Sequence, residues 1–382
     1  MARRITILGG GNGAFAAAGH LTMDGHEVTL FECPEFASSI EAIRKLGGVN
    51  LKTLPSNGIK EGFAPLRLIT TDIEAALADA EIVLVIVPSF AHKYMARVAG
   101  PHLKSSQLVV LATGNLFGVL EFARVVREAG SDADITYADL DCMMYACRKT
   151  DPAGVWLRGY KHSLGCAAFP AERNDEAFER LSEVYPYLVK KDNILATGMS
   201  NPNFAIHIPI MLFNIANIDR RRDMLFYADC MTESVGMFID AIDRERMAFD
   251  RNGIFSLVDL AEQDRRWYGY QGVHGSTIAE MGATSPLYPN SRMPTEKDHR
   301  YFTEDVPYGL IPALSLLKKF GYPHTSVETA ANAACILCGQ DFYAEARTLE
   351  HLGLDELSGT DLLRLVEHGF SHGAQRRASY FE

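Results

Sequence analysis

Two segments in the second half of the chain carry side chains that together could move a proton. The first, NFAIHIPIMLF (203–213), is an apolar helical pattern that carries one histidine, His207, just before Pro209. The second, FTEDVPYGLIP (302–312), holds Asp305 directly before an apolar run stiffened by prolines. A carboxylate that accepts a hydrogen bond from one imidazole nitrogen fixes the tautomer and stabilises the imidazolium. A histidine held in this way can donate a proton to a carbonyl oxygen as hydride reaches the carbon.

The sequence alone does not show that these two side chains meet, and His207 has a simpler interpretation. Its helical pattern is apolar on almost every side, which indicates a buried helix. A buried histidine needs a hydrogen-bonding partner whatever its role. Asp305 is the best-framed carboxylate near the end of the helical half, and its presence favours a functional pair over an ordinary core histidine.

A glycine-rich turn near the first residue could hold a phosphate. The stretch ILGGGNGAF follows a short strand-like run, opens a small-residue helix and reads G-x-G-x-x-A through Gly9, Gly11 and Ala14. The first glycine permits a tight turn, the second lets the backbone approach a pyrophosphate, and the alanine allows close helix–strand packing. The helix start, with Asn12 and Gly13, adds unpaired N–H groups and a positive dipole. In this strand–turn–helix context the pattern predicts a dinucleotide site.

Two more residues are expected to border that site. Glu32 ends the strand-like run EVTLFE (27–32), where a carboxylate would accept hydrogen bonds from both ribose hydroxyls of an adenosine. The same carboxylate would repel a 2′-phosphate, so the sequence favours NAD over NADP, unless Glu32 is only a solvated acid in a turn. Pro88 follows the apolar run IVLVIV (82–87) and is expected at the carboxyl edge of the sheet.

Elements of two kinds must position these residues. Up to about residue 190, strand-like runs alternate with helical stretches, which predicts a doubly wound parallel sheet of the Rossmann type. WLRGY (156–160) and SLGCAAF (163–169) are expected to add strands at its far end. Strand patterns nearly vanish after residue 197, where long helical patterns follow, among them 224–249. We therefore predict an α/β fold with a Rossmann domain at 1–196 and an all-α catalytic domain at 197–382.

Composition argues against several classes of partner. The 382 residues are 47% hydrophobic, and the net charge of −11 argues against a nucleic-acid or anionic membrane surface. The longest apolar run, IVLVIVP, is too short to cross a bilayer. Seven scattered cysteines without a disulfide framework favour a cytoplasmic location. No metal site is expected, because His368 and His372 have helical spacing but no third ligand.

Several stretches resemble the opine dehydrogenase family, which includes octopine and nopaline dehydrogenases. They are GGGNGA, MMYACR (143–148), the helix with Asn203 and His207, FYADCMTESVG (226–236), AIDRERMA (241–248) and RYFTEDVPYGLIP (300–312). The glycine motif is generic, whereas the histidine helix and the R-Y-x-x-E-D-V segment are far more specific. The resemblance implies a Rossmann domain and an all-α domain with the active site between them. It also implies reductive joining of an amino acid to a 2-oxo acid with a reduced nicotinamide cofactor, and His207 with Asp305 as the catalytic pair.

Substrate contacts are predicted less directly. Both substrates of such an enzyme carry a carboxylate, so a cationic fork is expected. Arg148 and Arg300 are the candidates, and each has a structural ion pair as its alternative. Asn203 could hydrogen-bond a substrate or cap its helix. Glu304 is expected to face solvent or a structural arginine, the stretch 262–298 is expected to shape the amino-acid pocket, and a homodimer is one option for the assembly.

Two other functions fit parts of the sequence. A reductase of a simple 2-oxo acid, of the ketopantoate reductase or glycerol-3-phosphate dehydrogenase type, would share the architecture. Those enzymes usually rely on a lysine in the helical domain, and this chain has none from 192 to 296. A non-catalytic NAD-sensing protein would keep the glycine turn without needing a buried histidine and a framed aspartate. The pair Tyr187 and Lys191 has the spacing of short-chain dehydrogenases, but Pro186 argues against the helix that this family needs.

Overall fold

The computed structural model describes residues 2–253 and 255–370, and the chain divides into two compact units. The first unit comprises Met1–Gly114 and Gly118–Lys190, and the second comprises Asn115–Phe117 and Lys191–Glu382. This division falls a few residues before the boundary predicted after residue 196. His372, weighed above as a metal ligand, lies outside the described residues.

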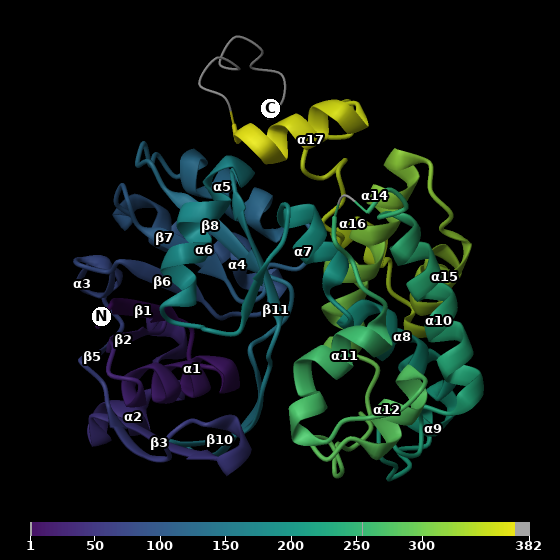
Figure 1. Cartoon of the computed structure of the whole chain (residues 1–382), viewed down its shortest axis with the longest axis horizontal. Coiled ribbons are helices and arrows are strands. Elements are labelled where there is room, and N and C mark those ends of the chain that lie inside the picture. Colours follow the sequence, from purple (N-terminus) through teal and green to yellow (C-terminus); the bar gives the residue numbers. More distant parts are fainter. Residues whose placement is uncertain (1, 254, 371–382) are drawn as a thin grey trace. The chain divides into compact units, whose positions relative to one another are not determined.

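An eight-stranded sheet in the order β12-β11-β8-β7-β6-β1-β2-β5 is the core of the first unit (Figure 1). Its strands are β1 (Arg4–Leu8), β2 (Glu27–Phe31), β5 (Leu68–Thr70), β6 (Ile82–Val85), β7 (Leu108–Leu111), β8 (Thr136–Leu140), β11 (Leu164–Phe169) and β12 (Leu188–Lys190). All neighbours run parallel except β8 and β11. Chain order reverses between β1 and β6, and ligands of such sheets bind at the carboxyl ends of the strands there. The predicted Rossmann-type sheet is confirmed.

A second sheet of four strands, in the order β4-β3-β10-β9, was not predicted. Its strands are β3 (Gly48–Thr53), β4 (Gly62–Pro65), β9 (Tyr145–Asp151) and β10 (Gly154–Tyr160). The assignment of 156–160 to the main sheet was therefore wrong, because β10 pairs with β3 and β9, whereas 163–169 does join the main sheet as β11. Helix α1 (Asn12–Met23) packs against both sheets, so all its residues from Ala14 to Leu21, most of them small, are buried.

Five further helices complete the first unit: α2 (Glu41–Leu46), α3 (Ile73–Leu77), α4 (His92–Ala99), α5 (Gly118–Glu128) and α6 (Asn174–Ser182). Helices α4 and α5 pack on each other, and α6 packs on β11. Tyr187 precedes strand β12 rather than lying on a helix, which removes the short-chain dehydrogenase pattern.

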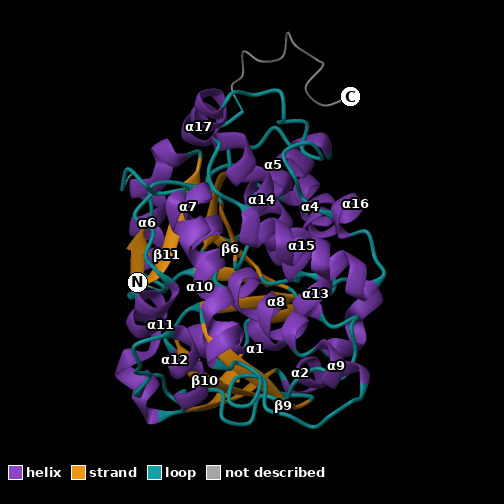
Figure 2. Cartoon of the chain, turned by 90° about the vertical axis from the view of Figure 1, so that its right-hand side faces the viewer, coloured by secondary structure: helices purple, strands orange, loops and turns teal. Residues whose placement is uncertain are grey.

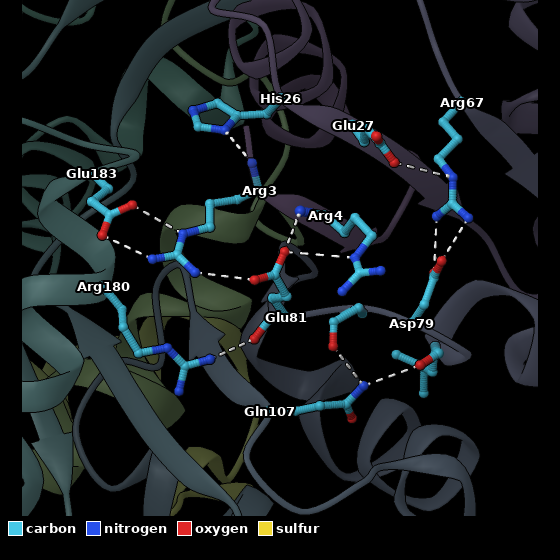
Figure 3. A network of polar contacts seen from close by, with 12 residues as sticks. Arg3, Arg4, His26, Glu27, Arg67, Asp79, Glu81, Gln107, Arg180 and Glu183 are labelled. Atoms are coloured by element: carbon cyan, nitrogen blue, oxygen red, sulfur yellow. Dashed lines mark hydrogen bonds and ion pairs between the residues drawn. The ribbon is translucent and has the colours of Figure 1, made fainter. Parts of the chain in front are cut away.

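Charged side chains close the amino-terminal edge of the main sheet (Figure 3). The carboxylate of Glu81, just before β6, accepts the backbone N–H of Arg4 at 2.9 Å and a side-chain N–H of Arg3 at 3.0 Å. Arg3 also donates to Glu183 at 2.8 Å, and Arg180 of α6 donates to the carbonyl of Glu81 at 2.8 Å. These bonds hold β1 in register with β6, and β1 leads into the glycine-rich turn.

Helices make up the second unit. They are α7 (Ile194–Ser200), α8 (Asn203–Phe213), α9 (Ile215–Asp219), α10 (Glu233–Ala248), α11 (Leu260–Tyr268), α12 (Ile278–Thr284), α13 (Arg300–Thr303), α14 (Ile311–Phe320), α15 (Thr325–Cys338), α16 (Phe342–Glu345) and α17 (Gly359–His368). Within its described residues there is one isolated bridge and no strand, so the strands in Figure 2, in orange, belong to the first unit. The predicted all-α second half is confirmed.

One predicted helix is shorter than expected. The pattern at 224–249 was interpreted as one helix, but α10 begins at Glu233 because the side chain of Thr232 accepts the N–H of Val235 and caps it. Residues 226–230 form a turn instead, and Leu225 pairs with Arg292 in an isolated bridge. Among the helices of the described ranges, none is long and apolar enough to cross a membrane.

Candidate active site

His207 and Asp305 meet in the second unit. Nδ1 of His207, on α8, lies 2.7 Å from Oδ2 of Asp305, and the two side chains are 13% and 4% exposed. The distance is that of a charge-assisted hydrogen bond. Because Nδ1–H donates to the carboxylate in this arrangement, Nε2 is the imidazole nitrogen left to exchange a proton with another molecule.

Close packing between α8 and a π-helical turn brings the two residues together. Asp305 directly precedes the π-helix Val306–Leu310, which continues into α14. A Cβ on Gly309 would lie 2.8 Å from the Cβ of Phe204, on the first turn of α8, so only glycine allows this approach. Isolated π-helical turns are frequent at functional sites. The proline- and glycine-rich frame around Asp305 therefore packs directly on the helix that carries His207.

Asn203 is the first residue of α8, and its side chain is not the cap of this helix. Pro202 occupies the N-cap position, where no side chain caps the helix, and Oδ1 of Asn201 accepts the backbone N–H of Asn203 at 2.9 Å. The amide nitrogen of Asn201 in turn donates to Oδ1 of Asn115, which ties the start of α8 to the short segment 115–117. Of the two roles considered for Asn203, capping by its side chain is therefore not the one observed.

Aromatic side chains surround the imidazole, and no sequence motif predicted them. Tyr301 stacks on it with ring centroids 4.0 Å apart at 30°, and Phe226 contacts its edge at 5.7 Å. The hydroxyl of Tyr227 lies 3.4 Å from Nε2 of His207. Burial raises the pKa of Tyr227 well above its usual value, so this hydroxyl stays protonated and can donate to Nε2.

These tyrosines lie next to candidate residues or within stretches that resemble the opine dehydrogenase family. Tyr301 follows Arg300, and Tyr227 lies in the FYADC stretch. Their ring positions depend on helix packing, which a local pattern does not reveal. The ring of Tyr288 lies 5.2 Å from that of Tyr227, so the stretch 262–298, which contains Tyr288, reaches the surroundings of His207.

The two candidate arginines differ in their surroundings. Arg300, on α13, forms an ion pair with Glu304, with Nη2 lying 2.9 Å from Oε2; the Glu304 carboxylate is buried, whereas the Arg300 side chain is 61% exposed. Glu304 therefore faces an arginine rather than solvent. Arg148 lies in the first unit, exposed on β9 opposite Trp156 of β10.

In the first unit, the glycine-rich turn has the shape that a pyrophosphate needs. Gly9 has φ 126°, and a Cβ there would lie 2.3 Å from the carbonyl oxygen of Ile86 at the end of β6. A Cβ on Gly11 would meet nothing within 4 Å, so the backbone is open at the start of α1. Asn12 is the first residue of that helix, and its neighbouring N–H groups and dipole suit an anion.

The other residues predicted to bind the cofactor lie at the start of α1 or at the ends of neighbouring strands. A Cβ on Gly13 would lie 2.7 Å from Cε of Met143, and Ala14 is fully buried. Pro88 is exposed beyond the carboxyl end of β6. Glu32 is only 9% exposed, and its Oε1 accepts the N–H of Cys33 at 2.8 Å. It is therefore not the solvated turn acid of the alternative interpretation.

Known proteins that this chain resembles along most of its length include opine and octopine dehydrogenases. The family model for the α-helical domain of NAD/NADP octopine/nopaline dehydrogenase matches residues 190–338, and that for the N-terminus of NAD-dependent glycerol-3-phosphate dehydrogenase matches residues 4–124. An opine dehydrogenase of Arthrobacter sp. (strain 1C) is 29% identical over 361 residues, 94% of this chain and 98% of the relative. An octopine dehydrogenase of Pecten maximus is 32% identical over 352 residues, 81% of this chain and 84% of the relative. A structure of octopine dehydrogenase with NADH and L-arginine has a TM-score of 0.76 at 19% identity and covers 97% of this chain and 99% of that chain, a likeness of fold.

Proposed function

Because this chain belongs to the opine dehydrogenase family, we propose that it couples the amine of an amino acid to the carbonyl carbon of a 2-oxo acid and reduces the product with NADH. The chain is an oxidoreductase that acts on a CH–NH bond. The observation that carries the assignment to particular residues is the 2.7 Å contact between His207 and Asp305.

His207 is the proton donor and acceptor of this reaction. The amine has to be neutral to attack the carbonyl, and the condensation releases water to give an imine. The imidazolium can donate a proton from Nε2 to the carbonyl oxygen and later to the imine nitrogen. NADH supplies the hydride to the imine carbon when it is bound. Asp305 keeps the proton of the neutral ring on Nδ1 and stabilises the charged ring, so it acts through His207 and is a positioning residue.

Charged and polar groups near His207 are suited to holding the substrates. Arg300 lies five positions before Asp305 in the sequence, and its exposed guanidinium can bind a carboxylate in two-pronged fashion. Asn203 lies one helical turn before His207 with its side chain partly exposed, so we assign it to substrate binding. The stretch 262–298 brings Tyr288 to this cluster and is the part of the chain that we expect to select the amino acid. Arg148 is the corresponding candidate in the first unit.

The glycine-rich turn fits a nicotinamide dinucleotide. The open backbone at Gly11 and the N–H groups at Asn12 and Gly13 would hold the pyrophosphate, with Pro88 beside them at the end of β6. Glu32 would accept the ribose hydroxyls of the adenosine. We propose that NADH is preferred over NADPH, because an ionised Glu32 repels a 2′-phosphate.

Location and assembly are proposed on separate grounds. A cytoplasmic location is supported by the seven cysteines, all within the described ranges and all free thiols. Recovery of the native protein in a secreted fraction would contradict it. A homodimer is supported by large apolar side chains exposed on helices of the second unit, such as Met237 and Ile336. Sedimentation velocity that gives only monomer would exclude it.

The decisive assay separates this function from reduction of a simple 2-oxo acid. NADH oxidation is measured with a panel of 2-oxo acids, each with and without a panel of amino acids. We expect substantial turnover only when both are present, and a product whose mass is the sum of both substrates minus water plus two hydrogens. Full-rate oxidation with the oxo acid alone, with a hydroxy acid as product, would overturn the assignment and leave the proposed cofactor intact.

A further inference from the structure

Lys149, on strand β9, reaches the glycine-rich turn although it is far away in sequence. Its Nζ donates to the carbonyl oxygen of Gly10 at 2.7 Å and to that of Ser39 at 3.3 Å. Its backbone N–H donates to Oδ1 of Asn12 at 2.8 Å, and its ammonium lies 3.5 Å from the centroid of the Phe15 ring. The second sheet thus places one cation at the start of α1, beside the predicted pyrophosphate site.

The carboxylate of Glu32 converges on the same point. A Cβ on Gly10 would lie 2.8 Å from Oε2 of Glu32 and 2.5 Å from Oγ of Ser39. The carbonyl groups of Gly10 and Ser39 are the two that hold Lys149. The ammonium and the carboxylate therefore lie around one residue of the turn, where Glu32 is expected to receive the adenosine ribose.

The opposite charges of Lys149 and Glu32 stabilise each other at a site that is partly buried. Burial lowers the pKa of Lys149, and the negative charge of Glu32 opposes this shift. Burial likewise raises the pKa of Glu32, while the N–H groups of Cys33 and Gly10 and the charge of Lys149 oppose it. Lys149 thus helps to keep Glu32 ionised, which is the form that accepts two ribose hydroxyls.

We propose that Lys149 is a specificity-determining residue for the cofactor: it supports the ionised Glu32 that binds NADH, and it is the cation that binds the 2′-phosphate of NADPH once Glu32 is neutral. An ammonium has three N–H donors and a freely rotating stem, so Nζ can leave a backbone carbonyl for a phosphate oxygen. This inference rests on the proposed function, because it assumes a dinucleotide at the glycine-rich turn. It predicts that discrimination against NADPH depends on both residues together.

A double-mutant cycle tests it. Dissociation constants for NADH and NADPH are measured by fluorescence titration on the full-length wild type, Glu32→Gln, Lys149→Met and the double variant. We expect Glu32→Gln to strengthen NADPH binding relative to NADH by about tenfold or more, the worth of one charge-assisted hydrogen bond. In the Lys149→Met background the same replacement should give a gain that is smaller by more than about twofold, the tolerance expected for independent sites. The repulsion by Glu32 is still removed there, but no cation is left to bind the 2′-phosphate. Lys149→Arg, which keeps a cation, should retain the gain.

The ratio of the dissociation constants for NADPH and NADH distinguishes a change in specificity from general damage to the glycine-rich turn. Loss of the Lys149 bond to Gly10 could weaken both cofactors alike, and such a change cancels in the ratio. Lys60→Met, at an exposed lysine of the same unit, is the matched control and should leave the ratio unchanged. An equal NADPH gain from Glu32→Gln with and without Lys149 would overturn the inference. No binding of either cofactor to the wild type would instead overturn the proposed function.

Discussion

In the proposed mechanism Asp305 acts on a substrate only through His207, so the two residues should differ in what their replacement does. His207→Ala removes the group that exchanges the proton and should lower kcat by roughly 10²- to 10⁴-fold. Asp305→Asn keeps the shape but removes the charge, and its amide can donate to Nδ1, which favours the wrong tautomer. We expect a loss in kcat with little change in KM, measured by NADH oxidation with saturating substrates.

A histidine of the same unit supplies the control for this comparison. His324 precedes α15, and its Nδ1 contacts a backbone carbonyl within its own turn. His324→Ala should keep wild-type turnover. If Asp305→Asn also kept it, Asp305 would have only a structural role beside a buried histidine. If His207→Ala kept it, His207 would be a core residue, as its apolar surroundings first allowed.

Among the elements, the sequence predicted the existence of individual strands and helices better than it predicted which strands pair with each other. Buried parallel strands such as β6 and β7 are continuous apolar runs, so their existence and the sheet class could be predicted. The run 156–160 was predicted as a strand but placed in the wrong sheet, because the pairing of β10 with β3 joins segments about a hundred positions apart. Lys149 was missed for the same reason, since only that second sheet brings β9 to the glycine-rich turn.

The helical half shows the same limit. The type and frame of Asp305 pointed to a functional group, and packing at Gly309 is what brings it to His207. Tyr227 and Tyr301 could not be selected in advance, because many tyrosines occur in the chain and only the helix packing decides which rings meet the imidazole. Residues within a local motif could therefore be selected from the sequence, whereas their neighbours from other elements could not.

The edge of the main sheet should be sensitive to acid through Glu81. The backbone N–H of Arg4 and the side chain of Arg3 lower the pKa of Glu81 below its ordinary value of 4.5. A carboxylate whose pKa is lower in the folded state than in the unfolded state stabilises the fold at pH values above its unfolded-state pKa. This contribution is lost as the pH falls through its folded-state pKa. Glu81→Gln should therefore lower the unfolding free energy by about 1 kcal/mol at neutral pH, and the difference should shrink below about pH 4.

Glu183→Gln is the matched comparison for this edge. Glu183 also binds Arg3 but accepts no strand N–H, and it is more exposed than Glu81. Its replacement should have the smaller effect at neutral pH, as expected for a surface pair. Chemical denaturation over a series of pH values measures both. A Glu81→Gln deficit that stays constant down to strongly acidic pH would show that the carboxylate charge does not hold this edge.

In the proposed function, the two units of the molecule carry different parts of the reaction. The glycine-rich turn and Glu32 lie in the first unit, whereas His207 and Asp305 lie in the second. A replacement in one unit should therefore affect cofactor binding without affecting proton transfer, or the reverse. Binding and turnover measured on the same variants can separate these roles.

Gly9→Ala should lose NADH binding, whereas His207→Ala should lose turnover while it still binds NADH. A Cβ on residue 9 would lie 2.3 Å from the carbonyl oxygen of Ile86, on a backbone with φ 126°, so the turn cannot keep its shape and NADH binding should be lost. His207→Ala should bind NADH as tightly as the wild type and still lose turnover. The control is Gly25→Ala, because Gly25 also has positive φ, 92°, but a Cβ there meets nothing within 4 Å. Gly25→Ala should lower the free energy of unfolding by about 1 kcal/mol and bind NADH normally.

Fluorescence titration with NADH measures binding by the three variants, and thermal unfolding verifies that each is folded. If His207→Ala weakened NADH binding as much as Gly9→Ala does, the separation of roles between the two units would be wrong, because the histidine would then be part of the cofactor site.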